Sequence, residues 1–172
     1  MSETKTAKEI ISELEALFSR WGTNKYDEQV SQIEHAVQCA DYARIDNADD
    51  ELIVATLLHD IGHLLELERR AGNVILTKND DHESTGAAYL ARHFSSAVTA
   101  PIALHVRPSD FCARPKIHIS PNFRLLRCAV SKCRAAKCRP MRSNASPNTP
   151  RASVPSLFAA GMNSAKISSQ VV

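Results

Sequence analysis

An apolar run that ends in two histidines and an aspartate constrains this chain more than any other feature. Residues 52–58 read Leu-Ile-Val-Ala-Thr-Leu-Leu, and His59-Asp60-Ile-Gly-His63 follows directly. A helix that is apolar on nearly every side packs inside a protein rather than on its surface. Imidazole and carboxylate groups are costly in such a place unless something binds them. The motif therefore favours a metal site over the alternative, a hydrogen-bonded core histidine beside a capping aspartate.

The spacing within this motif suits more than one metal ion. In an unbroken helix, His59 and His63 share a face four residues apart, and Asp60 points about 100° away from His59. A histidine and an aspartate side by side can serve neighbouring ions, with the two carboxylate oxygens free to bridge them.

Length and composition are those of one soluble domain. The chain has 172 residues, of which 44% are hydrophobic and 5% aromatic. No apolar run is long enough to cross a membrane, and the N-terminus lacks the apolar segment of a signal peptide, so we expect a cytoplasmic protein. Five cysteines, only one of them before residue 107, argue against a disulfide framework.

The net charge of +2 hides two unlike parts. Residues 1–106 hold 9 Lys and Arg against 18 Asp and Glu, whereas residues 107–172 hold 12 Lys and Arg against a single acid, Asp110. The second part also holds seven of the eight prolines and four of the five cysteines, and no stretch of it sustains a helical or alternating period. We expect a domain over residues 1–106 and a basic, poorly structured tail over 107–172.

Helix-start signals and apolar spacing predict an all-α bundle of about five helices in the first part. Thr6 with Glu9, and Ser31 with Glu34, form capping boxes, and Asp49 suits a third helix start. The polar stretch 66–79 is predicted to be a loop. The predicted helices run from 6 to 21, from 31 to 44, from 49 through the central motif, from 80, and from Thr99.

Six candidate ligand residues are spread over four of these helices. Imidazole and carboxylate groups suit zinc, iron, manganese or nickel, and a buried cluster of them is hard to retain without metal. Taken alone, His35 is as compatible with a partly exposed polar residue as with a ligand, and His93 is expected at the surface. The candidates are His35, His59, Asp60, His63, His82 and His105.

Four segments carry a resemblance to a known family. They are residues 32–40, 57–63, 82–90 and 104–106, which contain His35, the His59–His63 motif, His82-Glu83 and His105. Together they resemble the HD-domain superfamily of metal-dependent enzymes. Within it they are most similar to the mixed-valence diiron oxygenases that cleave organophosphonates, of the 2-amino-1-hydroxyethylphosphonate oxygenase type. The resemblance covers roughly residues 26–107.

The resemblance implies a role for each matching residue. His35, His59 and Asp60 would hold the first iron, and Asp60 would bridge to a second iron held by His82 and His105. His63 would contact the substrate phosphonate, and Glu28 would lie near the substrate amine. An Fe(II)/Fe(III) pair would use O₂ to convert a 1-hydroxyphosphonate into phosphate and a carboxylate, whereas zinc acts only as a Lewis acid.

The chain departs from the family after Val106. The family continues with Ala-Lys-Arg-aromatic-Leu and later a Trp-Asp pair, but here Ser109 stands at the lysine position and no Trp-Asp follows. Codons allowed for residues 107–113 can be read in another frame as Ala-Lys-Arg-Phe-Leu-Cys. We therefore expect a shifted reading frame after about Arg107, which sequencing the gene tests. The expected consequences are weak or absent activity and marginal stability.

Several alternatives stay open on the sequence alone. An HD-type phosphohydrolase acting on a nucleotide or another phosphate ester, with Mn, Zn or Mg, shares the His-Asp pair. A non-catalytic metal-binding product is a further possibility. A basic tail for nucleic acid or anionic membrane is less favoured, because its charges are scattered with few aromatics between them. Cys128, Cys133 and Cys138 are five apart, which is not the usual zinc-ligand spacing. The expected partners are a small phosphonate or phosphate and O₂.

Overall fold

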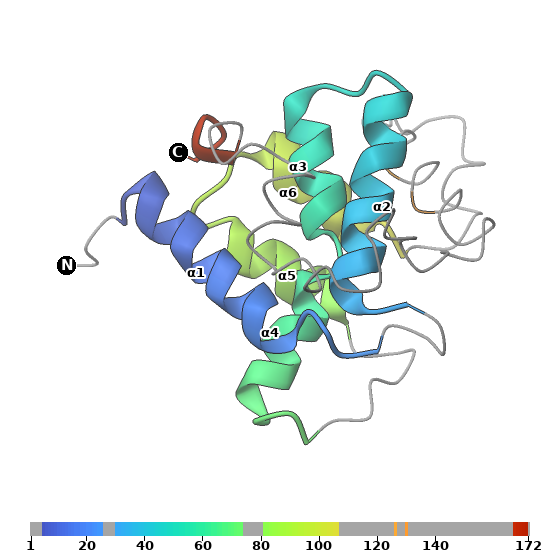
Figure 1. Cartoon of the computed structure of the whole chain (residues 1–172). Helices are drawn as coiled ribbons and strands as arrows, with labels where there is room; N and C mark the ends of the chain where they lie inside the picture. Colours follow the sequence, from blue (N-terminus) through green and yellow to red (C-terminus); the bar gives the residue numbers. More distant parts are fainter. Residues whose placement is uncertain are drawn as a thin grey trace, which may run out of the picture.

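The computed structural model describes residues 5–25, 30–73, 81–106, 126, 130 and 167–171, and these residues form a helical bundle (Figure 1). Apart from two isolated bridges, their regular structure is all α-helical, which confirms the predicted fold class. Helix α2 packs on α3, α3 on α6, α6 on α5, α5 on α4, and α4 on α1. The helices are α1 (Ala7–Trp21), α2 (Gln32–Ile45), α3 (Asp50–Leu58), α4 (Ile61–Arg69), α5 (His82–Leu90) and α6 (Ser96–Leu104).

The capping signals act as the sequence predicts. The Thr6 side chain accepts from the Glu9 backbone N–H while Glu9 reaches back to the Thr6 backbone, and Ser31 and Glu34 repeat this at α2. Each box satisfies two N–H groups that the first helical turn leaves without partners. The box at Ser31 fixes where α2 begins, three residues before His35.

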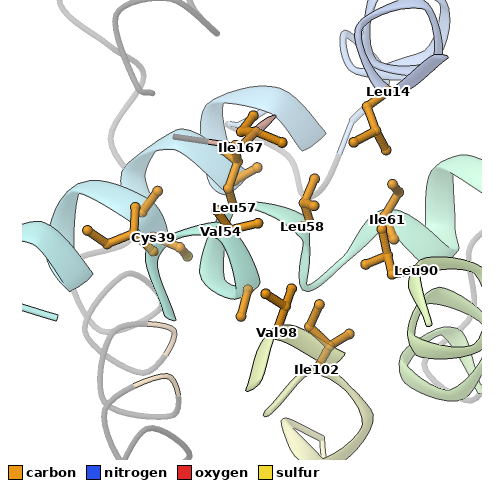
Figure 2. Close-up of a cluster of buried hydrophobic side chains, with 14 of the residues drawn as sticks. Leu14, Cys39, Val54, Leu57, Leu58, Ile61, Leu90, Val98, Ile102 and Ile167 are labelled. Atoms are coloured by element: carbon orange, nitrogen blue, oxygen red, sulfur yellow. The ribbon is translucent and has the colours of Figure 1, made fainter. Parts of the chain in front are cut away.

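Helix α3 is the centre of the core. All of its residues from Leu52 to Leu58 are buried, so it is enclosed by its neighbours on every side, as its composition predicts. Figure 2 shows its side chains between those of the other helices, with Cys39 of α2 on one side and Val98 and Ile102 of α6 on another. The site that follows α3 is thereby attached to a helix whose residues from Leu52 to Leu58 are all buried.

The chain breaks its helix at the central motif, which corrects the prediction of one long third helix. Asp60 adopts φ −99° and ψ 13°, so α3 ends at Leu58 and α4 starts at Ile61. This break is why the structure has six helices in its described part rather than about five. It also removes the basis for expecting His59 and His63 on one helical face.

Two further boundaries differ from the predictions. Helix α6 begins at Ser96, about one turn before the predicted Thr99, and Pro101 lies inside it. Helix α4 continues to Arg69, into the stretch predicted as a loop, and ends in a turn where Ala71 and Gly72 have positive φ. The rest of that predicted loop, residues 74–80, lies outside the described residues.

Among the residues described beyond Val106, three have side chains that belong to the core. Leu126, Val130 and Ile167 are buried in the same apolar cluster, and Val171 forms an isolated bridge with Phe94. Apart from residues 126, 130 and 167–171, the predicted tail lies outside the described residues. None of the helices described is long and apolar enough to span a membrane.

The N-cap of α3 provides a test of how local signals stabilise this scaffold. The Asp49 side chain accepts from the Leu52 backbone N–H at 2.9 Å. We expect Asp49→Ala to lower the free energy of unfolding by about 1 kcal/mol, because that N–H loses its acceptor. Asp49→Asn, which keeps a capping oxygen, should cost only a few tenths. Urea denaturation of the metal-free protein measures both, and equal losses for the two variants would contradict this role.

Candidate metal centre

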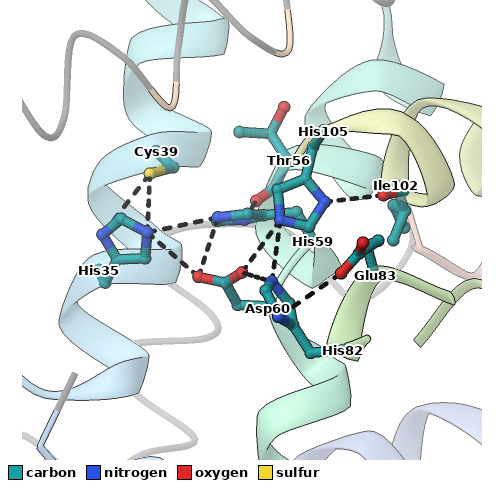
Figure 3. Close-up of polar contacts among 9 residues, drawn as sticks. All are labelled: His35, Cys39, Thr56, His59, Asp60, His82, Glu83, Ile102 and His105. Carbon is teal, nitrogen blue, oxygen red and sulfur yellow. Dashed lines mark hydrogen bonds and ion pairs between the residues drawn. The ribbon is translucent and has the colours of Figure 1, made fainter. Parts of the chain in front are cut away.

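Five of the predicted ligand residues meet at Asp60. His35 comes from the first turns of α2, His59 and Asp60 from the junction of α3 and α4, His82 from the first residue of α5, and His105 from the end of α6. All five are buried, with His35 and His59 fully so. Figure 3 shows the four imidazole rings arranged around the Asp60 carboxylate. The cluster thus draws on α2 and α6, which pack on α3, together with the α3–α4 junction and the start of α5.

One half of the cluster is built on Asp60 Oδ2. The Nε2 atoms of His35 and His59 lie 3.3 Å and 3.1 Å from this oxygen. The two nitrogens are 3.3 Å from each other. The three atoms therefore form a nearly equilateral triangle, which we call the first position.

The other half repeats this arrangement on Asp60 Oδ1. The Nε2 atoms of His82 and His105 each lie 3.3 Å from it and 3.2 Å from each other. We call this triangle the second position. Each position thus offers two imidazoles and one oxygen of a shared carboxylate, a donor set that is typical of non-haem iron and also suits other divalent metals.

The Nδ1 atoms of His59 and His105 make hydrogen bonds that hold the Nε2 atoms of both rings towards Asp60. His59 Nδ1–H donates to the Thr56 carbonyl at 2.7 Å, and His105 Nδ1–H donates to the Ile102 carbonyl at 2.7 Å. Both histidines follow the last residue of a helix, and each ring donates to a backbone carbonyl of that helix's last turn. Because a carbonyl only accepts, Nδ1 carries the proton and Nε2 keeps its lone pair.

This arrangement fits metal ions. Lone pairs on His59 and His105 point at a carboxylate, and both Asp60 oxygens are buried without a hydrogen-bond partner in the described part of the chain. Such a cluster is repulsive unless cations lie between the groups. The centre of a triangle with sides of about 3.2 Å lies about 1.9 Å from each corner, close to the roughly 2.0–2.1 Å of metal–imidazole bonds.

The protonation states suit cation binding. Burial raises the pKa of Asp60, but in the metal-free protein the charge of a protonated His59, with hydrogen bonds from the other imidazoles, outweighs burial and holds that pKa well below its usual value. Burial lowers the pKa of His105, with Asp60 opposing the shift. A charged carboxylate and a neutral imidazole are the forms that metals bind.

Two neighbouring side chains were not among the predicted site residues. Cys39 Sγ lies 3.7 Å from His35 Nε2 and, with His35 and His59, forms a further group of possible donors. Glu83 Oε2 lies 3.7 Å from His82 Nδ1. The signals were present in the sequence, since Cys39 is one helical turn after His35 and Glu83 is next to His82.

The close contact between α4 and α5 depends on glycine. A Cβ added at Gly62 would lie 2.1 Å from the His82 carbonyl oxygen, and one added at Gly86 would lie 3.1 Å from Ile61 Cγ2. Without a Cβ, α4 approaches the backbone of His82 directly and brings that residue to Asp60.

The other predicted residues lie as follows. His63 is half-buried, stacks on the His82 ring at 3.9 Å between centroids, and groups with Asp60 and His82 as possible donors. It is therefore beside the second position. His93 is partly exposed and contacts Tyr89, as expected for a residue outside the site. Glu28 lies outside the described residues.

Comparison with known proteins relates this geometry to a family. The family model of the HD domain matches residues 32–121. A hydroxymethylphosphonate dioxygenase from Gimesia maris is 45% identical over 106 residues, which are 62% of this chain and 53% of that protein. A [1-hydroxy-2-(trimethylamino)ethyl]phosphonate dioxygenase (glycine-betaine-forming) from Leisingera caerulea is 32% identical over 108 residues, which are 62% of this chain and 55% of that protein. The chain spans about half the length of these curated relatives.

Proposed function

Because this chain belongs to the HD-domain family, we propose that it derives from a two-metal oxygenase that cleaves the carbon–phosphorus bond of a 1-hydroxyphosphonate. The observation that carries the proposal is the pair of two-histidine triangles joined through Asp60. Support for phosphonate as the substrate class comes from the names of the two relatives. The HD-domain family match alone is equally compatible with a phosphohydrolase.

We assign the two positions to two iron ions. His35, His59 and Asp60 would hold the first, and Asp60, His82 and His105 the second. Iron can change its oxidation state and so supply the electrons that reduce O₂. A hydrolase with Mn, Zn or Mg needs no such electron transfer, because hydrolysis does not consume O₂. Histidine with a single carboxylate oxygen is the donor set found in non-haem iron oxygenases.

The chain's own side chains would bind and orient the substrate. His63 lies next to the second position, and in this proposal its ring would donate a hydrogen bond to a phosphonate oxygen. Its ring is stacked on His82, which limits its rotation and so would fix the phosphonate relative to the metals. Glu28, assigned near a substrate amine, remains a prediction.

The overall reaction balances with O₂ as the sole oxidant. The reactants would be one hydroxymethylphosphonate dianion and one O₂, and the products one formate and one dihydrogen phosphate. Atoms and charge are equal on the two sides. The carbon is oxidised to a carboxylate, the C–P bond breaks, and O₂ is reduced. A hydrolase acting on a phosphate ester would instead release phosphate without consuming O₂.

The test is O₂ uptake measured together with phosphate release from hydroxymethylphosphonate by the iron-loaded full chain. We expect equal amounts of O₂ consumed and phosphate formed, at a rate below that of the Gimesia maris relative because Ser109 replaces the family's lysine. Phosphate release from an ester without O₂ would favour the phosphohydrolase. Bound metal with neither activity would favour the non-catalytic alternative.

His63 gives a prediction specific to substrate binding. We expect His63→Asn to raise the KM for hydroxymethylphosphonate roughly 10–100-fold, since a hydrogen bond to a charged group contributes about 1.5–3 kcal/mol. Metal content should stay at the wild-type value, because the five ligand residues are untouched. His93→Asn, at a partly exposed histidine outside the metal centre, is the matched control and should leave KM unchanged. An unchanged KM in His63→Asn would remove this residue from the substrate site.

A further inference from the structure

We propose that Glu83 is a positioning residue for the second metal position and acts through His82. The His82 ring lies between two carboxylates: its Nε2 is 3.3 Å from Asp60 Oδ1, and its Nδ1 is 3.7 Å from Glu83 Oε2. Figure 3 shows Glu83 on the side of the ring away from Asp60. The inference rests on the metal centre proposed above.

The outer contact of His82 differs in kind from those of two other ligand residues. His59 and His105 direct Nδ1–H at peptide carbonyls, which are neutral acceptors. His82 directs Nδ1 at a carboxylate. At 3.7 Å this is an electrostatic contact rather than a hydrogen bond. A carboxylate on the outer side of a metal-binding histidine orients the ring and makes the inner nitrogen a stronger donor to the metal.

The charge of Glu83 is placed to act on this position. The side chains of Glu83 and His82 are 18% and 10% exposed, so water screens their interaction less than at the protein surface. A negative charge beside the second position favours a bound cation, and it favours the oxidised ion over the reduced one. Glu83 therefore raises metal affinity at this position and lowers the reduction potential of an ion bound there.

A purely structural role for Glu83 makes a different prediction. Glu83 lies in the first turn of α5, where an acid also stabilises a helix N-terminus through the helix dipole. Loss of that effect would lower the stability of the metal-free protein without changing the reduction potential of bound iron. The two roles are therefore separable.

Glu83→Gln is the variant of choice, because it keeps the size of the side chain and an acceptor oxygen but removes the charge. We expect affinity for the second ion to fall roughly 10–100-fold, as on loss of other outer partners of metal-bound histidine. Affinity for the first ion should not change. The midpoint potential of the iron-loaded centre should move to more positive values.

Glu51→Gln is the matched control. Glu51 lies in the first turn of α3, so its replacement also removes one acid from a helix N-terminus. It should lower the stability of the metal-free protein to a similar extent and leave metal affinity and midpoint potential at their wild-type values.

The experiment is a stepwise Mn(II) titration of the metal-free full chain, followed by an anaerobic redox titration of the iron-loaded form by EPR. Weaker uptake of one ion and a positive shift of potential in Glu83→Gln alone support the role. Behaviour of Glu83→Gln like that of Glu51→Gln overturns it while leaving the metal centre intact. Failure of the wild-type chain to take up metal would refute the centre, and this role with it.

Discussion

Asp60→Asn should abolish binding of both metal ions at once, whereas His35→Ala or His105→Ala should abolish binding of one. Asp60 Oδ2 contributes to the first position and Oδ1 to the second, and among the described residues each triangle has no other carboxylate oxygen. Asparagine has nearly the same shape, but it is uncharged and offers one oxygen. Affinity at both positions should therefore fall by more than the roughly 10–100-fold that loss of an outer partner costs.

Metal content of the Mn(II)-reconstituted proteins measures this directly, together with the shift of the unfolding temperature on adding metal. Wild type should be stabilised by Mn(II), because an ion that binds only the folded state shifts the equilibrium towards it. Asp60→Asn should show no such shift. Asp41→Asn on the exposed surface of α2 is the control. Retention of one full ion by Asp60→Asn would show that the carboxylate does not join the two positions.

Gly62→Ala should destabilise the fold and displace His82 from the centre. The new Cβ would lie 2.1 Å from the His82 carbonyl oxygen and 2.8 Å from the His82 Cα, and backbone atoms cannot move aside as the end of a side chain can. Overpacking of this kind costs about 1–3 kcal/mol, and we expect a loss near the upper end. Because α5 must shift, binding at the second position should be lost while the first is retained.

Gly86→Ala is the matched variant on the other side of the same contact. Its Cβ would lie 3.1 Å from Ile61 Cγ2 and 3.2 Å from the Gly62 backbone nitrogen, so its closest contact is about 1 Å longer than the one at Gly62. We expect a smaller loss of stability and full metal content. Denaturation curves and metal analysis of both variants provide the comparison. Equal behaviour of the two would mean that the Gly62–His82 approach does not position the ligand.

The sequence predicted the scaffold where local signals and burial agree. Both capping boxes, the N-cap at Asp49 and the enclosure of α3 follow from residue types at fixed spacing. It also identified the five residues that the structure brings together at Asp60. The choice of these five came from the resemblance to the HD-domain superfamily, since His35 taken alone was as compatible with a partly exposed polar residue.

What the sequence could not show depends on tertiary contacts. Residues 57–63 contain no signal in the sequence that distinguishes one long helix from two. The break lies at Asp60, whose backbone conformation is seen only in the structure. The start of α6 was missed because proline is typical of a first turn, which led to a predicted start at Thr99. The helix instead begins at Ser96 and has Pro101 in its interior. The contacts of Cys39 with His35 and of Glu83 with His82 are consistent with their spacing in the sequence, but which ring nitrogen each faces is shown only by the structure.

The region after Val106 remains the least constrained. The burial of Leu126, Val130 and Ile167 shows that side chains beyond the predicted domain end complete the core. The shifted reading frame, the cytoplasmic location and the reduced activity stay predictions.

The most direct test of the two-metal centre is EPR and Mössbauer spectroscopy of the full chain loaded with iron and partly oxidised. Two irons per chain with an exchange-coupled mixed-valence signal are expected, since a shared carboxylate couples the ions, and the signal should be absent from Asp60→Asn. One iron per chain, or two magnetically independent irons, would contradict a centre joined through Asp60.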